Sequence, residues 1–282
     1  MLNFPNAKIN LGLRILNKRE DGFHNIESVF YPVNYSDALE IIPSEKFSFQ
    51  SNNNSFSKEA WDNLCVKAYE LLRVDFELPP AIFFLYKSIP VGAGLGGGSA
   101  DAAFALKMLN QIFNLELSDN KLESYAAQLG SDCVFFIKNK AALVTGRGEE
   151  LKSIDIDLSN YSIVIATPAI TINTAAAYKL WDELMGHVKS ERKTPLNEIV
   201  TQPVSKWKEQ LENDFETVIF NQYPSLKSVK EKLYDEGAIY ASLSGSGSSL
   251  YGIFEKGDIN VSNAEKACIK FDQNVTLFWV NN

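Results

Sequence analysis

The chain has few of the residue types that metal clusters and disulfide scaffolds need. Among 282 residues there are two histidines, His24 and His187, and three cysteines, Cys65, Cys133 and Cys268. The cysteines are far apart, odd in number and surrounded by apolar residues, which predicts buried thiols in a reducing compartment. Because no Cys and His spacing fits a zinc-type cluster, we expect no metal site built from these residues.

Long apolar runs are also missing. The longest strictly apolar stretches, such as 81–86 and 133–137, are far shorter than the roughly 20 residues that span a bilayer. The N-terminus MLNFPNAKIN has no basic segment followed by an apolar core, and no small-residue cleavage site. We therefore expect a cytoplasmic protein that does not bind membranes.

Positive charge is scarce relative to negative charge. Lys and Arg total 27 and Asp and Glu total 35, so the formal net charge is −8. This balance disfavours nucleic acid as a partner. If the protein binds a polyanion, its basic groups must be gathered in one local site. Apolar residues at 45% and charged residues at 22% are close to the values of globular proteins. A small molecule is the expected partner, and the oligomeric state stays open.

Two kinds of periodicity alternate along the chain without a regular βαβ repeat, which predicts an α+β fold. Helical spacing includes a segment that Ser57 can cap, with Trp61, Leu64, Ala68, Leu71 and Leu72 on one face. Further helices are expected from residue 98, at 118–129, from a cap at Thr174, and at 204–221, 225–236 and 262–271. Strands are expected at 9–16, 28–33, 38–42, 46–50, 81–87, 141–145, 162–167, 239–243, 249–254 and 276–280.

The length fits one large or two ordinary domains. Residues 149–160 are polar and acidic without a periodic apolar set, so we place the junction there, with domains at 1–152 and 153–282. The run 133–137 is too short to distinguish helix from strand by its periodicity. Residues 189–201 read as a charged surface insertion.

The most informative segment is PVGAGLGGGSADAA, from Pro90 to Ala103. Five glycines within seven residues are entropically unfavourable, so the chain must need close backbone approach or positive φ there. The glycines lead into Ser99 and a predicted helix, whose N-terminus carries partial positive charge, and this arrangement favours phosphate binding. The segment has neither the Gly-Lys-Ser/Thr of a Walker A loop nor the context of a dinucleotide-binding fingerprint.

Two other segments, PNAKINLGLRI at 5–15 and SLSGSGSSLYGIF at 242–254, complete a set of three separated signatures. In this order they resemble the GHMP kinase superfamily, whose members transfer the γ-phosphoryl group of ATP to small alcohols. The resemblance covers nearly the whole chain and implies a two-lobe fold with its active site in the cleft between the lobes. It implies ATP and Mg²⁺ as cofactors and a nucleotide loop of Pro90, Gly92, Gly94, Leu95, Gly96, Gly97, Gly98 and Ser99.

The segment from Asn3 to Val33, together with the GLGGGSADAA loop, narrows the resemblance to kinases of a cytidylylated sugar alcohol. It implies phosphorylation of the 2-hydroxyl of 4-diphosphocytidyl-2-C-methyl-D-erythritol in the non-mevalonate route to isoprenoid precursors. By the same resemblance Asp132 is the catalytic base and Lys8 stabilises the charge that develops during transfer. Ala100 stands where relatives often have a second serine.

The resemblance also implies a substrate site. His24 is expected to hydrogen-bond the cytosine, Phe23 to stack on it in place of a frequent tyrosine, and Asn10 to contact the substrate nearby. Thr174 is either only a helix cap or also part of this site. The alternatives are a homoserine or mevalonate-type kinase, a decarboxylase that first phosphorylates a tertiary alcohol, and a non-catalytic nucleotide-binding regulator.

Overall fold

The structure is a computed structural model that describes residues 1–52, 60–186, 194–256 and 275–281. The expected helix at 262–271, together with Cys268 and His187, lies outside these residues. No helix in the described part of the chain has the length and apolar character needed to cross a membrane.

The described residues form two compact units, each assembled from separate stretches of sequence. The linear division after residue 152 stays a prediction, and residues 149–160 lie inside the second unit. Unit 1 comprises Met1–Lys8, Tyr35–Val91 and Gly96–Lys140, and unit 2 comprises Ile9–Asn34, Gly92–Leu95 and Ala141–Asn282.

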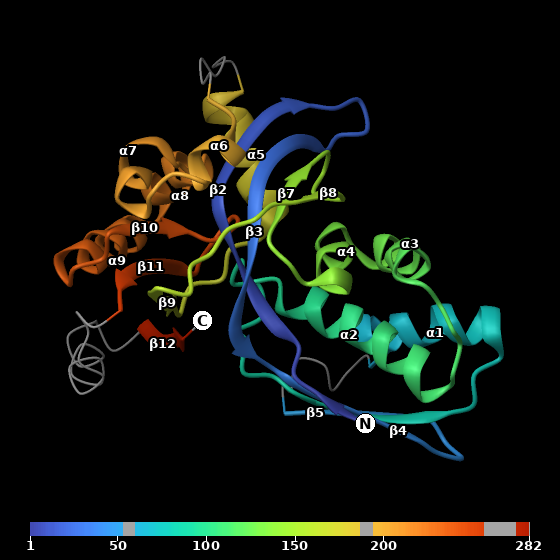
Figure 1. Cartoon of the computed structure of the whole chain (residues 1–282). Helices are drawn as coiled ribbons and strands as arrows, with labels where there is room; N and C mark the ends of the chain where they lie inside the picture. Colours follow the sequence, from blue (N-terminus) through green and yellow to red (C-terminus); the bar gives the residue numbers. More distant parts are fainter. Residues whose placement is uncertain (53–59, 187–193, 257–274, 282) are drawn as a thin grey trace. The chain divides into compact units, whose positions relative to one another are not determined.

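Unit 1 contains a four-stranded sheet in the order β1-β4-β6-β5. In β6 the side chains of Ala81, Phe83 and Leu85 are buried and alternate with more exposed neighbours, as a sheet with one covered face requires. Helices α1 to α4 gather on one side of this sheet (Figure 1). The strands are β1 (Leu2–Asn3), β4 (Ala38–Pro43), β5 (Ser48–Ser51) and β6 (Ala81–Tyr86).

The helices of unit 1 begin at residues that cap their first turns. The expected helix around Trp61 begins later, because Asn63 accepts a hydrogen bond from the backbone N–H of Cys65. Trp61 is exposed, which is contrary to the prediction, whereas Ala68 and Leu72 are buried as expected, together with Cys65. The run 133–137 is helical. The elements are η2 (Ala60–Asp62), α1 (Leu64–Phe76), α2 (Gly97–Ile112), α3 (Asp119–Leu129) and α4 (Ser131–Lys138).

Unit 2 contains two four-stranded sheets, in the orders β2-β3-β7-β8 and β10-β11-β9-β12. All the expected strands of this region are present, and β8 adds one that the acidic composition of 149–160 concealed. The strands are β2 (Asn6–Lys18, which begins in unit 1), β3 (His24–Ser36), β7 (Ala142–Thr145), β8 (Glu150–Ser153), β9 (Tyr161–Pro168), β10 (Tyr240–Leu243), β11 (Leu250–Glu255) and β12 (Val275–Asn281).

The helix expected at 204–221 is interrupted at 211–214. There the backbone leaves the helix to pair with β2, since Leu13 N–H donates to Glu212 O and Asp214 N–H donates to Leu13 O. The expected surface insertion is wrong at its C-terminal end, where α6 buries Leu196 and Ile199. The elements are α5 (Thr174–Met185), α6 (Leu196–Val200), η3 (Val204–Lys206), α7 (Trp207–Gln210), α8 (Phe215–Gln222) and α9 (Pro224–Asp235).

Candidate active site

In unit 1 the N-terminus of α2 lies beside Lys8. Gly96 precedes the helix with φ +72°, and no side chain caps the first turn. A Cβ atom added to Gly96 would lie 3.0 Å from Cζ of Phe136 and 3.2 Å from Cγ of Lys8. The loop therefore passes tightly over both residues. Its first-turn N–H groups have no intrahelical acceptor and favour an anion.

A lysine and an aspartate face each other at this place. Lys8 lies near the start of β2, and Asp132 lies in the first turn of α4. The distance from Lys8 Nζ to Asp132 Oδ2 is 3.5 Å, and the side chains are 4% and 35% exposed. The carboxylate is thus open to a ligand while the lysine is enclosed.

Burial changes the acidity of Lys8. Removal from water lowers its pKa, and the nearby Asp132 carboxylate opposes this effect without cancelling it. A cation held beside an accessible carboxylate stabilises an alkoxide or a phosphoryl oxygen, while the carboxylate accepts a proton. The pair therefore fits phosphoryl transfer to an alcohol.

The remaining glycines of the loop serve different purposes. A Cβ atom on Gly97 would approach Ile89 Cγ2 to 2.8 Å, so Gly97 is required by packing. Around Gly98 the nearest atom is Leu64 Cδ1 at 4.0 Å, and the residue is exposed. Neither close packing nor a positive φ therefore explains why Gly98 lacks a side chain. Pro90 is half-buried ahead of the loop.

Ser99, half-buried in the same turn, contacts the residue that follows Asp132. Its side chain hydrogen-bonds the thiol of Cys133, the residue after Asp132, and burial raises the pKa of Cys133 to about 12. The thiol is therefore an inert packing group. Ala100, the next residue of α2, is fully buried.

A cluster that sequence reasoning missed supports the base of this loop. Lys87 Nζ contacts Asp37 and lies 2.6 Å from Asp101 Oδ2, and all three side chains are at most 5% exposed. Asp37 also accepts hydrogen bonds from the backbone N–H groups of Ser88 and Ile89. Burial raises the pKa of Asp101 to about 7, against the opposing effect of Lys87. The cluster joins the chain before the loop to the first turns of α2.

In unit 2 the first part of the loop docks on the turn between β10 and β11. Ser244 Oγ donates to Gly94 O at 2.9 Å, and Ser249 N–H donates to Ala93 O at 3.1 Å. A Cβ atom on Gly94 would lie 2.1 Å from Ser244 O. Gly94 is thus required by close contact between two backbones. Gly92 has φ +71°, and Leu95 is buried.

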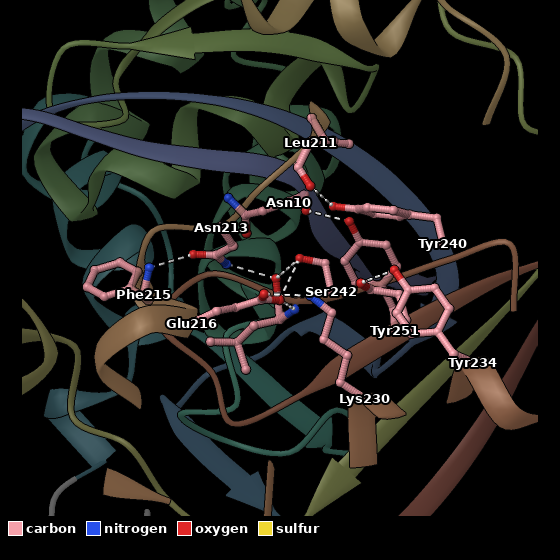
Figure 2. A network of polar contacts seen from close by, with 12 residues as sticks. Asn10, Leu211, Asn213, Phe215, Glu216, Lys230, Tyr234, Tyr240, Ser242 and Tyr251 are labelled. Atoms are coloured by element: carbon pink, nitrogen blue, oxygen red, sulfur yellow. Dashed lines mark hydrogen bonds and ion pairs between the residues drawn. The ribbon is translucent and has the colours of Figure 1, made fainter. Parts of the chain in front are cut away.

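A buried polar network, drawn in Figure 2, holds Asn10 and this turn. The Tyr251 hydroxyl donates to Asn10 O at 2.8 Å. Asn213 Nδ2 donates to Leu243 O and Gly245 O at 2.9 and 2.8 Å. Glu216 accepts from Leu243 N–H at 2.8 Å. The side chains of Asn213 and Glu216 therefore hold the backbone of the turn in place.

The side chain of Asn10 is held as well. Its Nδ2 donates to Ser28 Oγ at 2.9 Å, and Ser28 Oγ donates to Gly12 O at 2.6 Å. Asn10 Oδ1 lies 3.5 Å from Ser244 Oγ. The residue is buried, so its amide is oriented by the protein.

The structure places His24 in the interior of unit 2, although an isolated histidine in a turn is usually exposed. Its Nε2 atom lies 2.6 Å from Asp182 Oδ1. Its ring stacks on Tyr178, with centroids 4.9 Å apart and planes 10° apart. Phe23 is exposed, and the Arg147 guanidinium lies 5.1 Å from its ring centre.

Thr174 is not the helix cap that the sequence suggests. Asn173 caps α5 by accepting from Ala176 N–H, and Thr174 is the first helical residue. Its Oγ1 lies 3.0 Å from Ser246 Oγ, so it contacts the glycine and serine turn. Thr174 remains a candidate for substrate contact.

Tyr178 and Asp182 are functional candidates that sequence reasoning missed. They are four residues apart on α5 and therefore share one face, which is the available signal. The signal alone does not reveal that this face meets His24.

The described residues contain no group of three or more His, Cys, Asp or Glu side chains that would hold a metal ion. Mg²⁺ in nucleotide sites is usually held by one or two protein oxygens together with phosphates. The exposed part of Asp132 and the Ser99 hydroxyl are suitable oxygen donors.

Comparisons with known proteins give a consistent result. Residues 63–140 match the GHMP kinases N terminal domain, and residues 199–267 match the GHMP kinases C terminal domain. The chain is 50% identical over 258 residues to a 4-diphosphocytidyl-2-C-methyl-D-erythritol kinase of Bacteroides fragilis (strain YCH46), which covers 90% of this chain and 92% of the relative. A kinase of the same name from Cytophaga hutchinsonii is 46% identical, covering 90% and 92%.

Solved structures share the fold. A crystal structure of 4-(cytidine 5'-diphospho)-2C-methyl-D-erythritol kinase has a TM-score of 0.81 and 28% identity, covering all of both chains. A homoserine kinase from Cytophaga hutchinsonii has a TM-score of 0.71 at 16% identity, covering 98% of this chain and 94% of that one. The second likeness concerns the fold alone.

Proposed function

The chain belongs to the 4-diphosphocytidyl-2-C-methyl-D-erythritol kinase family of the GHMP kinases, and we propose that it phosphorylates the 2-hydroxyl of that cytidylylated alcohol with ATP. This reaction is a step of the non-mevalonate route to isoprenoid precursors. The observation that carries the proposal is the Lys8 and Asp132 pair beside the bare N-terminus of α2.

The chemistry follows from what these groups do. Asp132 accepts the proton of the attacking hydroxyl, because an alcohol is a weak nucleophile without a base. Lys8 stabilises the negative charge on the reacting oxygens. The first-turn N–H groups of α2 hold the phosphates of ATP. Ser99 and an oxygen of Asp132 would hold Mg²⁺ together with phosphate oxygens of ATP, and the ion would supply charge neutralisation.

Substrate selection is assigned to residues of unit 2. Phe23, exposed at the turn before β3, supplies a stacking face for a base. His24 supplies an edge contact that selects the base, and Asn10 and Thr174 contact the rest of the substrate. This assignment separates the present chain from homoserine and mevalonate kinases, which have no base to recognise.

A coupled ADP-release assay tests the reaction. The cytidylyl alcohol should support turnover, whereas homoserine and mevalonate should not. Turnover with either of the latter would replace the proposed substrate, and ATP binding without turnover would favour a nucleotide-binding regulator.

The nucleotide site has its own test at Gly98. Because this position is open and lies in a first helical turn, Gly98→Asp should leave the fold intact and even suit the helix dipole. The added carboxylate should repel the phosphates and weaken ATP binding at least 10-fold, measured by calorimetry. Gly98→Asn, of the same size without charge, is the control. Equal affinities of the two variants would contradict an anion site at this turn.

A further inference from the structure

One helix holds the buried His24 ring at two points. Asp182 Oδ1 on α5 lies 2.6 Å from His24 Nε2, and the His24 side chain is 5% exposed. One turn earlier on the same helix, Tyr178 stacks on the imidazole with a centroid separation of 4.9 Å. Tyr178 is itself supported edge-on by Phe215 at 4.9 Å. The ring therefore has one orientation, and one of its nitrogen atoms is already engaged.

Asp182 is an ionised hydrogen-bond acceptor. Lys18 Nζ lies 2.6 Å from Oδ2, the other carboxylate oxygen. Partial burial pushes the pKa of Asp182 upward, but the hydrogen bonds from Lys18 and His24 outweigh it, and the pKa lies below its ordinary value. Since an ionised carboxylate cannot donate, His24 must carry a hydrogen on Nε2.

This contact determines the character of the opposite ring nitrogen. In a neutral imidazole with hydrogen on Nε2, the Nδ1 atom is an acceptor. Among the described residues, Asp182 is the hydrogen-bond partner of His24, and it engages Nε2.

We propose that Asp182 is a positioning residue that fixes the Nε2–H tautomer of His24, so that Nδ1 accepts from an amino-bearing pyrimidine and rejects uracil. The inference rests on the proposed function, in which a pyrimidine base binds at Phe23 and His24. Cytosine presents an amino donor where uracil presents a carbonyl acceptor. When the uracil carbonyl faces Nδ1, two acceptors meet and neither receives a hydrogen bond. This predicts that cytosine is preferred over uracil by roughly 10- to 100-fold.

Asp182→Asn tests the inference, because an amide can accept from Nε2–H or donate to Nε2 and so no longer dictates the tautomer. Calorimetry measures the ratio of cytidine diphosphate to uridine diphosphate affinity, and kinetics measures the same ratio for the two nucleotidyl alcohols. We expect the preference to fall about 10-fold, through KM, with kcat within 2-fold and the KM of ATP unchanged. Nitrogen and carbon NMR shifts of the His24 ring should change from the Nε2–H form to a mixture.

Glu183→Gln is the matched control, since Glu183 is the next residue on α5 and makes only an exposed pair with Lys179 among the described residues. Asp182→Glu should restore the preference in part. An Nδ1–H tautomer in the parent protein, or an unchanged base preference after the tautomer is lost, would overturn the role of Asp182. An inactive parent that still prefers cytidine diphosphate would instead contradict only the proposed reaction.

Discussion

Two lysine and aspartate pairs start from the same strand, β2, and have opposite properties. Lys8 is 4% exposed and stands 3.5 Å from Asp132, whereas Lys18 is 57% exposed and lies 2.6 Å from Asp182. The first pair is enclosed on the lysine side and loose, so its carboxylate is available to a ligand. The second is tight, exposed on the lysine side, and engaged on both carboxylate oxygens. Environment and spacing, more than residue type, separate the pair proposed to react from the pair proposed to orient His24.

A third cluster, Lys87 with Asp37 and Asp101, shows the buried extreme. Asp101 Oδ1 is buried without a hydrogen-bond partner among the described residues. Two carboxylates share one cation there, and the raised pKa of Asp101 keeps its carboxyl protonated to about pH 7. All three side chains are enclosed, so this cluster is not open to a ligand.

The largest expected effect comes from removing the base. Asp132→Asn keeps the shape of the side chain but cannot accept a proton from the substrate hydroxyl. We expect kcat to fall roughly 100- to 10,000-fold, with both ligands still bound by calorimetry. Asp119→Asn, an exposed first-turn aspartate of α3, should be silent. Near-normal turnover would place the Asp132 pair in the same orienting class as the Asp182 pair.

Lys8→Met should lower kcat roughly 100- to 1,000-fold, because one preorganised positive group at the reacting oxygens is lost. The pH profile identifies the cause. Since burial lowers the pKa of Lys8, the parent activity should decline at alkaline pH below the ordinary lysine value of about 10.4. The variant should lack this decline. If it retains the decline, another group titrates there.

The Asp101 cluster predicts a pH-dependent stability. The folded carboxyl keeps its proton up to about pH 7, whereas the unfolded one releases it near pH 3.9. Between these values the folded state binds more protons, so the free energy of unfolding falls as the pH rises. The fall is at most about 4 kcal/mol, since the two pKa values differ by about 3 units and each unit is worth about 1.36 kcal/mol. The raised pKa of Lys87, where two carboxylates outweigh burial, acts only at higher pH.

Urea unfolding at pH 4.5, 6 and 8 measures this effect. Asp101→Asn should remove most of the pH dependence, since an amide does not titrate, while Asp119→Asn should keep it. The same slope in the parent and in Asp101→Asn would show that the proton resides elsewhere.

Much of this architecture could be predicted from the sequence. Short alternating strands and the three motifs are local patterns, and the resemblance extends over nearly the whole chain, so the α+β class and the strands of unit 2 follow. The prediction of one continuous helix at 204–221 is wrong, because the break depends on the pairing of Leu13 with residues 212–214. No local pattern in the sequence reveals this pairing. The prediction that Trp61 lies on the buried face is wrong, because Asn63 caps α1 and the helix begins after Trp61.

At the site, the motifs identified candidate residues but did not reveal every structural reason for the residue type at each position. Gly94 and Gly97 read as phosphate contacts, and the structure shows that close packing also requires them. Asp182 has no motif, since its importance arises from a partner 158 residues away in the sequence. Contacts between distant segments are what sequence patterns omit.

The smallest expected effect concerns the exposed lysine of the orienting pair. Lys18→Met removes one of the two hydrogen bonds to Asp182 and leaves the one from His24 in place. Because more than half of the Lys18 side chain is exposed, screening limits its contribution to roughly 0.2–1 kcal/mol. We therefore expect the KM of the cytidylyl alcohol to rise about 2-fold, with kcat and the KM of ATP unchanged. The difference from the parent should shrink in high salt, since salt screens an exposed pair. Lys179→Met, an exposed lysine on the neighbouring face of α5, is the control. A loss of 10-fold or more, or any fall in kcat, would show that Lys18 acts on the substrate directly and would make the two pairs on β2 alike.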